Sequence, residues 1–144
     1  MNPPPLLFDA SSILLLVKKS RSKSPDILLN GSTISLVYYE VGNALWRECT
    51  LLQRITLKEA GKLLESIFAL IQAMDVAVLD DEKLGGVILN MAGEQNITFY
   101  DAAYLAEAQR SNRTLVTDDE KLADAAKIVG VKTLASKDIA AKIS

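Results

Sequence analysis

The stretch LLFDASSIL, residues 6–14, joins an apolar run to an acid and to the beginning of a helix. Residues 6–8 are all apolar, which is typical of a short strand buried in a parallel sheet. Asp9 ends that run, and an apolar helical stretch follows from Ile13 to Val17. A strand, an acid and a helix in this order predict the first βα unit of an α/β domain.

Strand and helix patterns alternate along the rest of the sequence. Short apolar runs that predict strands lie at residues 33–36, 75–79, 113–117 and 131–134. Apolar positions at helical spacing predict helices over residues 41–52, 56–71, 81–94, 101–110 and 119–129, and a last helix from residue 136. The basic segment 18–25 reads as a loop, in which Pro25 is able to begin a further turn. The pattern predicts one α/β domain over residues 1–144, with a mostly parallel sheet of about five strands.

The composition excludes several classes of active site. The 144 residues include no histidine and one cysteine, Cys49. A Ser-His-Asp triad, a Cys-His pair, a Cys/His zinc site and an intramolecular disulfide are therefore all excluded. The apolar fraction of 49% and the charged fraction of 24% are ordinary for a globular protein. The groups that remain available for catalysis are carboxylates, hydroxyls, the side chains of Lys and Arg, and a metal ion.

The charge and the N-terminal sequence bound the partners and the compartment. Sixteen basic against eighteen acidic residues give a net charge of −2, so overall charge does not predict nucleic-acid binding, although a local basic patch could still supply it. The N-terminal residues 1–5 lack the cationic region of a signal peptide. The apolar stretch after them is far shorter than the roughly 20 residues that span a bilayer. We therefore expect no membrane association, and the single cysteine is compatible with a reducing cytoplasm.

Acidic residues recur where a predicted strand ends or a predicted helix begins. Asp9 ends the first strand, Glu40 follows the second, Asp101 begins a helix, and the pair Asp118-Asp119 follows the fourth strand. In an open parallel sheet, ligands bind outside the carboxyl ends of the strands, so these acids could converge on one edge. Mg²⁺ and Mn²⁺ prefer such hard oxygen ligands, and a cation keeps neighbouring carboxylates ionised. Such a cation can activate water for attack on a phosphodiester without histidine.

Helix capping is the alternative explanation for several of these acids. The segments 98–101 and 117–120 match the capping-box pattern, and so does the segment 56–59, which has no evident chemistry. Acids in a first helical turn are also favoured by the helix dipole. Asp9 and Glu40 fit this explanation less well, because apolar neighbours would desolvate an unpaired carboxylate. For these two acids a structural salt bridge is the alternative to a metal site.

Four segments in this order resemble the PIN-domain ribonucleases, particularly the VapC-type toxins of prokaryotic toxin–antitoxin pairs. The similarity covers nearly the whole chain. The first segment is Asp-x-Ser after the first strand, with Asp9 and Ser11, and the second is a Glu-x-x-Asn-x-Leu-Trp helix, with Glu40, Asn43 and Trp46. The third is Tyr-Asp-Ala-Ala-Tyr, with Asp101, and the fourth is Leu-Val-Thr-x-Asp, with Thr117 and Asp119. Each segment alone is a weak signal, and the four together are a strong one.

The resemblance implies a metal-dependent endoribonuclease with a three-layer α/β/α fold. Asp9 and Asp101 would bind Mg²⁺ or Mn²⁺ directly, and Glu40 and Asp119 would hold metal-bound waters or a second metal. A metal-activated water would then attack the RNA phosphodiester. The resemblance also implies a homodimer and an antitoxin that covers the site.

Supporting roles follow from the same resemblance. The hydroxyls of Ser11 and Thr117 would orient carboxylates. Asn43 follows Glu40 by three residues, so both side chains can face the same side of one helix. The Thr-x-Asp spacing selects Asp119, which leaves Asp118 as an auxiliary or surface acid. Basic side chains could contact RNA phosphates or an acidic antitoxin segment, and these are Lys18, Lys19, Arg21, Lys23, Arg47, Arg54, Arg110 and Arg113.

Packing is the simpler expectation for three further residues. Trp46 is expected in the core or an interface, Tyr104 in the core and Cys49 as a buried small side chain. Two other functions remain open: a catalytically silent PIN fold that only binds RNA or protein, and a phospho-receiver with an acidic Mg²⁺ pocket. Such receivers usually carry an acidic pair after the first strand and a Lys after the last, whereas Asp9 is followed by Ala10 and Lys137 is a poor candidate for that Lys.

Overall fold

The structure is a computed structural model that describes residues 5–20 and 22–141. Within those residues, five strands form the sheet: β1 (Leu6–Phe8), β2 (Ser32–Ile34), β3 (Asp75–Ala77), β4 (Thr114–Val116) and β5 (Thr133–Leu134). The helices are α1 (Ala10–Lys19), α2 (Ser24–Leu28), α3 (Leu36–Trp46), α4 (Leu57–Gln72), α5 (Glu82–Gln95), α6 (Phe99–Arg110), α7 (Glu120–Ile128) and α8 (Ser136–Ala141), with a π-helical turn η1 (Arg47–Leu51) after α3.

All strand pairs are parallel, and the strand order is β3-β2-β1-β4-β5. This confirms the α/β class and the parallel sheet expected from the sequence. The chain builds outward from β1 to β2 and β3, and then crosses to the other side of β1 to form β4. The order therefore reverses between β1 and β4, and the edge beyond their carboxyl ends is where open α/β sheets bind ligands.

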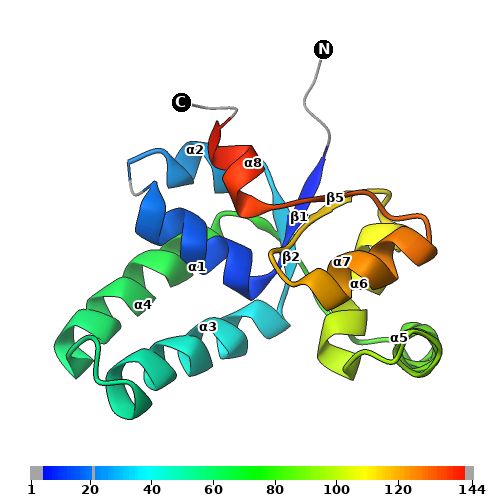
Figure 1. The fold of residues 1–144 in the computed structure, drawn as a ribbon, viewed down its shortest axis with the longest axis horizontal. Helices are drawn as coiled ribbons and strands as arrows, with labels where there is room; N and C mark the ends of the chain where they lie inside the picture. The colour runs from blue at the N-terminus through cyan, green and yellow to red at the C-terminus, as the bar shows by residue number, and fades with distance from the viewer. Residues whose placement is uncertain (1–4, 21, 142–144) are drawn as a thin grey trace.

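Helices cover both faces of the sheet and make the three layers visible in Figure 1. Alternate residues of the central strands point to opposite faces, as the pleat requires. Phe8 and Val116 pack with α1, α2, α3, α4 and α8, whereas Leu7 and Leu115 pack with α5, α6 and α7. All four of these side chains are fully buried. The sheet therefore separates two apolar cores, and the central strands β1 and β4 contribute to both.

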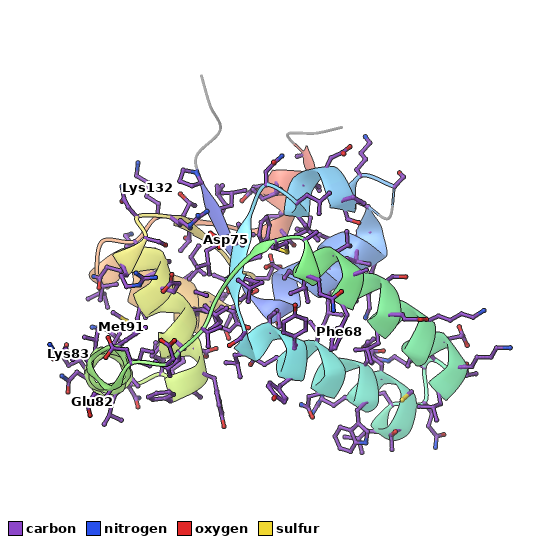
Figure 2. All side chains as sticks on the ribbon, turned by 180° about the vertical axis from the view of Figure 1, so that it is seen from behind. Phe68, Asp75, Glu82, Lys83, Met91 and Lys132 are labelled. Atoms are coloured by element: carbon purple, nitrogen blue, oxygen red, sulfur yellow. The ribbon has the colours of Figure 1, made fainter. Side chains whose placement is uncertain are left out.

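Helices α3 and α4 run side by side and project from the sheet as an arm (Figure 1). Phe68 points from α4 towards α3 (Figure 2), where its ring meets Tyr38 edge-on with the centroids 4.9 Å apart. Trp46, at the far end of α3, is half exposed, so it does not pack in the core. Cys49 in η1 is only partly buried, which corrects the expectation of a buried thiol.

Several element boundaries differ from those expected. Helix α1 begins at Ala10 instead of Ile13, because Asp9 caps it. The strand expected at 33–36 ends at Ile34, and Leu36 already belongs to α3. The expected basic loop is shorter, since α1 continues to Lys19 and α2 begins at Ser24 with Pro25 in its first turn; Arg21 lies outside the described residues.

Residues at the ends of two helices have the conformations that their types favour. Thr56 and Glu59 form a complete capping box at the start of α4. Gly130 follows α7 with φ of +80°, a conformation that glycine adopts without steric cost. In the described part of the chain, no helix is long and apolar enough to cross a membrane.

Replacing Gly31 with alanine should destabilise the fold, because Gly31 approaches the ring of Phe8. A Cβ at this position would lie 2.9 Å from Cδ2 of Phe8, a ring that is fully buried in the core. We expect Gly31→Ala to lower the free energy of unfolding by about 1–3 kcal/mol, measured by urea denaturation.

Gly86→Ala is the matched control, since Gly86 lies in α5 and a Cβ there meets no atom within 4 Å. That variant should be more stable than the parent by about 0.5–1 kcal/mol. Equal stability of the Gly31→Ala variant and the parent would contradict the close packing of Gly31 against Phe8.

Candidate active site

A cleft of about 600 Å³ opens at the carboxyl edge of the sheet. Its walls come from the starts of α1 and α6, from α3 and from the β4–α7 connection. Six of the residues expected at the site line this cleft: Asp9, Ser11, Glu40, Asn43, Asp101 and Asp119. The structure thus brings together acids that are up to 110 residues apart, from Asp9 to Asp119.

Asp9 lies at the point where the strand order reverses, and only 6% of its surface is exposed. Its Oδ1 accepts a hydrogen bond from the backbone N–H of Ser12 (2.9 Å), so Asp9 is the N-cap of α1. The Thr117 hydroxyl also hydrogen-bonds the Asp9 carboxyl. Asp9 therefore begins a helix and lines the cleft at the same time.

Glu40 lies in the interior of α3, where no backbone donor is left to satisfy it. Its Oε1 accepts a hydrogen bond of 2.7 Å from the hydroxyl of Tyr104, on α6. Tyr104 is 1% exposed. The expectation that Tyr104 packs in the core is correct for the ring, whereas its hydroxyl reaches the site.

Asp101 and Asp119 both stand at helix starts, in different capping positions. Asp101 is in the first turn of α6, and its backbone N–H donates to Oγ1 of Thr98 (3.0 Å), which is the N-cap. Asp119 is itself the N-cap of α7, because its Oδ1 accepts from the backbone N–H of Leu122 (3.1 Å). The capping box expected for 117–120 is therefore wrong, since Asp119 takes the place of Thr117.

Thr117 has a different role. It lies directly after β4, and its side chain is buried. Its Oγ1 accepts from the backbone N–H of Asp119 (3.1 Å), and its hydroxyl hydrogen-bonds Asp9. One side chain thus links the acids that follow β1 and β4. The carboxylate-orienting role expected for Thr117 stays a prediction.

Asp118 points away from the cleft. Its Oδ1 accepts from the backbone N–H of Ser136 (2.9 Å) at the start of α8. Its charge still contributes to raising the pKa of Asp9. Asp119 is therefore the member of the pair that enters the cleft, and Asp118 connects the β4–α7 segment to α8.

Burial and mutual repulsion raise the pKa values of three acids in the cleft. Burial is the largest cause for Asp9, Glu40 and Asp101. The charges of Asp101 and Asp9 raise the pKa of Glu40 further, and the charge of Asp119 raises that of Asp101. Hydrogen bonds oppose these shifts, from Thr117 and Ser12 to Asp9, from Tyr104 to Glu40 and from Thr98 to Asp101. The acids are electrostatically coupled, and each would ionise more readily beside a positive charge.

The donor set fits a hard divalent cation, held with solvent as further ligands. In residues 5–20 and 22–141, no three carboxylate or thiol side chains stand close enough to enclose an ion by themselves. Mg²⁺ ordinarily uses one or two protein carboxylates and keeps several waters, so a closed cage is not required. The chemistry of the donors supports this fit, because carboxylate oxygens are the ligands that Mg²⁺ and Mn²⁺ prefer.

Sequence reasoning missed two polar contacts of the site. The Ser12 hydroxyl is fully buried and donates to the backbone oxygens of Asp9 (2.9 Å) and Val116 (3.0 Å), which ties α1 to β4. The phenol of Tyr104 was the second. Ser12 lies three residues after Asp9, and this spacing is the signal that could have indicated its contact; no local pattern indicates that Tyr104 contacts Glu40, 64 residues away.

Arg47 is the basic residue that lines the cleft, together with the aromatic rings of Tyr39 and Tyr100. Other basic residues singled out in the sequence form ion pairs elsewhere. These pairs are Lys18 and Arg54 with Glu48, Arg110 with Glu107, and Arg113 with Asp75.

The chain is similar to two proteins of Pyrobaculum aerophilum, although no family model matches it. It is 35% identical to exonuclease VapC9 over 102 residues, which cover 70% of this chain and 71% of that protein. It is 32% identical to ribonuclease VapC3 over 130 residues, which cover 83% and 92%. The crystal structure of PAE2754 from the same organism superimposes with a TM-score of 0.76 at 27% identity, covering 96% of both chains.

The parallel three-layer fold with an acidic cleft at its carboxyl edge is that of a PIN-like domain. Its similarity to VapC9 and VapC3 then specifies the group. The chain belongs to the VapC family of PIN-domain toxins. The resemblance seen in the four sequence segments is confirmed.

Removing the Asp9 charge should stabilise the metal-free protein at neutral pH. The pKa of Asp9 is higher in the folded than in the unfolded state, so the folded state binds this proton more tightly. The free energy of unfolding therefore falls as the pH rises from the pKa of Asp9 in the unfolded state through its pKa in the folded state. We expect Asp9→Asn to unfold at a higher temperature than the parent in EDTA at pH 7. In a chain of this size, each kcal/mol added to the free energy of unfolding raises the unfolding temperature by about 2–4 °C. The difference should narrow as the pH falls towards 4.

Asn keeps an Oδ1 that can accept from the Ser12 N–H, so the cap is preserved in this variant. Saturating Mg²⁺ should raise the unfolding temperature of the parent more than that of Asp9→Asn. Asp124→Asn, which changes an exposed acid of α7, is the control and should respond to Mg²⁺ like the parent. A lower unfolding temperature for Asp9→Asn than for the parent in EDTA would refute the cost assigned to this buried charge.

Proposed function

We propose that this protein is a divalent-cation-dependent endoribonuclease, the toxin of a type II toxin–antitoxin pair. One observation carries the proposal: Asp9, Glu40, Asp101 and Asp119, from four separate elements, line one cleft, in which burial and the charges of neighbouring acids raise the pKa values of Glu40 and Asp101. Membership of the VapC family supports a nuclease, since its two relatives are named an exonuclease and a ribonuclease.

In this proposal Asp9 and Asp101 hold Mg²⁺ or Mn²⁺ directly, and Glu40 and Asp119 act on it through waters or at a second ion. The cation, when bound, supplies water activation and neutralises charge on the phosphodiester. Ser12 and Thr117 hold the Asp9 carboxyl in place through hydrogen bonds. Histidine is not required, in agreement with its absence from the sequence.

Local charge, rather than net charge, would hold the RNA. Asn43 on α3 and Arg47, the first residue of η1, line the cleft beside the acids and are four residues apart. A guanidinium suits phosphate oxygens, and single-stranded bases stack on exposed aromatic rings such as those of Tyr39 and Tyr100. We propose that the backbone of a single-stranded RNA crosses the cleft along α3.

A circular single-stranded RNA tests this activity, because it has no end from which an exonuclease can begin. With Mg²⁺ or Mn²⁺, the parent should open the circle, and EDTA should prevent cleavage. Asp101→Asn should slow the reaction at least about 100-fold, since a cation contributes several kcal/mol to such reactions. Asp124→Asn should cleave like the parent.

Cleavage of linear but not circular RNA would replace the endonuclease by an exonuclease. Undiminished cleavage by Asp101→Asn would overturn the site assignment. Binding of RNA without cleavage at any Mg²⁺ or Mn²⁺ concentration would instead favour a silent binding scaffold.

We further propose that the protein acts in the cytoplasm as a homodimer that a small antitoxin binds. An apolar cleft of about 230 Å³ lies between the carboxyl ends of β2 and β3, α5 and α6. Val78 and Tyr100 stand at its rim and are about 60% exposed, and such apolar patches mark interaction surfaces. Tyr100 and Leu36 line both this cleft and the acidic one, so a second copy seated here would adjoin the site.

A charge placed in the apolar cleft should prevent dimer formation. We expect the parent to have twice the chain mass in light scattering after gel filtration, and Val78→Asp to have the mass of one chain. Ile128→Asp, at an exposed apolar residue of α7, should leave the dimer intact. A monomeric parent, or a dimeric Val78→Asp variant, would contradict this surface.

A further inference from the structure

Tyr104 is the largest fully buried side chain of the described residues, and its hydroxyl ends at the site. The ring packs on α6 in the core between the sheet and α5–α7. The hydroxyl crosses to α3, where it donates to Oε1 of Glu40 at 2.7 Å. A buried phenol requires a hydrogen-bond partner, and here the partner is an ionisable acid of the cleft instead of a nearby carbonyl oxygen.

This contact determines how the Glu40 carboxylate is held. Glu40 extends from the interior of α3, and a glutamate side chain has three rotatable bonds. A charge-assisted hydrogen bond to a rigid ring reduces that freedom. Because the bond occupies Oε1, it leaves Oε2 for a cation or for a water on the cation.

The hydroxyl is a donor and not a competing ligand. The hydrogen bond runs from the O–H of Tyr104 to Oε1 of Glu40, so the phenol gives its proton to this contact. Tyr104 and Asp101 lie three residues apart on α6, on the same face. A single helix therefore supplies one acid of the cleft and the donor that holds another.

We propose that Tyr104 is a positioning residue: its O–H fixes the Glu40 carboxylate relative to Asp9 and Asp101, so that the cleft is preorganised for a divalent cation. This inference rests on the proposed metal-dependent function. Partners that orient metal-binding groups in this way typically change metal affinity or activity about 10–100-fold when they are removed.

Tyr104→Phe removes the hydroxyl oxygen and keeps the ring that fills the core. We expect the affinity for Mn²⁺, measured by electron paramagnetic resonance on the protein without RNA, to fall about 10-fold. The Mg²⁺ concentration that gives half-maximal RNA cleavage should rise by a similar factor, and excess Mg²⁺ should restore most of the rate. Tyr38→Phe is the matched control, because Tyr38 packs on Phe68 in the arm, and it should bind Mn²⁺ like the parent.

A double variant separates positioning from packing. If Tyr104 acts through Glu40, then Tyr104→Phe should have little further effect on Mn²⁺ affinity in a Glu40→Gln protein. An unchanged Mn²⁺ affinity in Tyr104→Phe, or the same 10-fold loss with and without Glu40→Gln, would overturn the inference while leaving the proposed function intact. A parent that neither binds Mn²⁺ nor cleaves RNA would overturn both.

Discussion

The burial of neighbouring carboxylates at one edge of the sheet is the constraint on which the rest of the structure depends. Burial and neighbouring charge raise the pKa values of Asp9, Glu40 and Asp101, so ionising them opposes folding at neutral pH. Apolar side chains on both faces of the sheet offset this cost. A bound cation would offset the negative charge that the fold gathers in the cleft. The same acids therefore lower the stability of the fold when they are ionised and are needed in that form for the proposed chemistry.

Local structure and the site use the same side chains. Asp9 and Asp119 each accept a backbone N–H at the start of a helix, and each also lines the cleft. The positive ends of α1 and α7 therefore stand beside these acids. Capping and ligand binding, which compete as explanations of the sequence, are compatible in the structure, because each carboxylate has a second oxygen.

The sequence predicts the class of fold and the acids of the cleft, because both depend on local signals. A three-residue apolar run followed by Asp9 is such a signal, and so is Asp101 in the first turn of α6. The strand order and the contact between Glu40 and Tyr104 depend on packing between segments 64 residues apart, which no local pattern contains. The capping box expected at Thr117 failed for a related reason: the proximity of β1 gives this hydroxyl another partner in Asp9.

The position of β4 beside β1 has a consequence for synthesis of the chain. The backbone N–H of Asp9 donates to the oxygen of Val116, and the Ser12 hydroxyl reaches the same atom across 104 residues. Contacts of such high sequence separation form late in folding. A ribosome must therefore release most of the chain before the neighbours of Asp9 can assemble, so a nascent or truncated polypeptide that stops before β4 lacks the cleft.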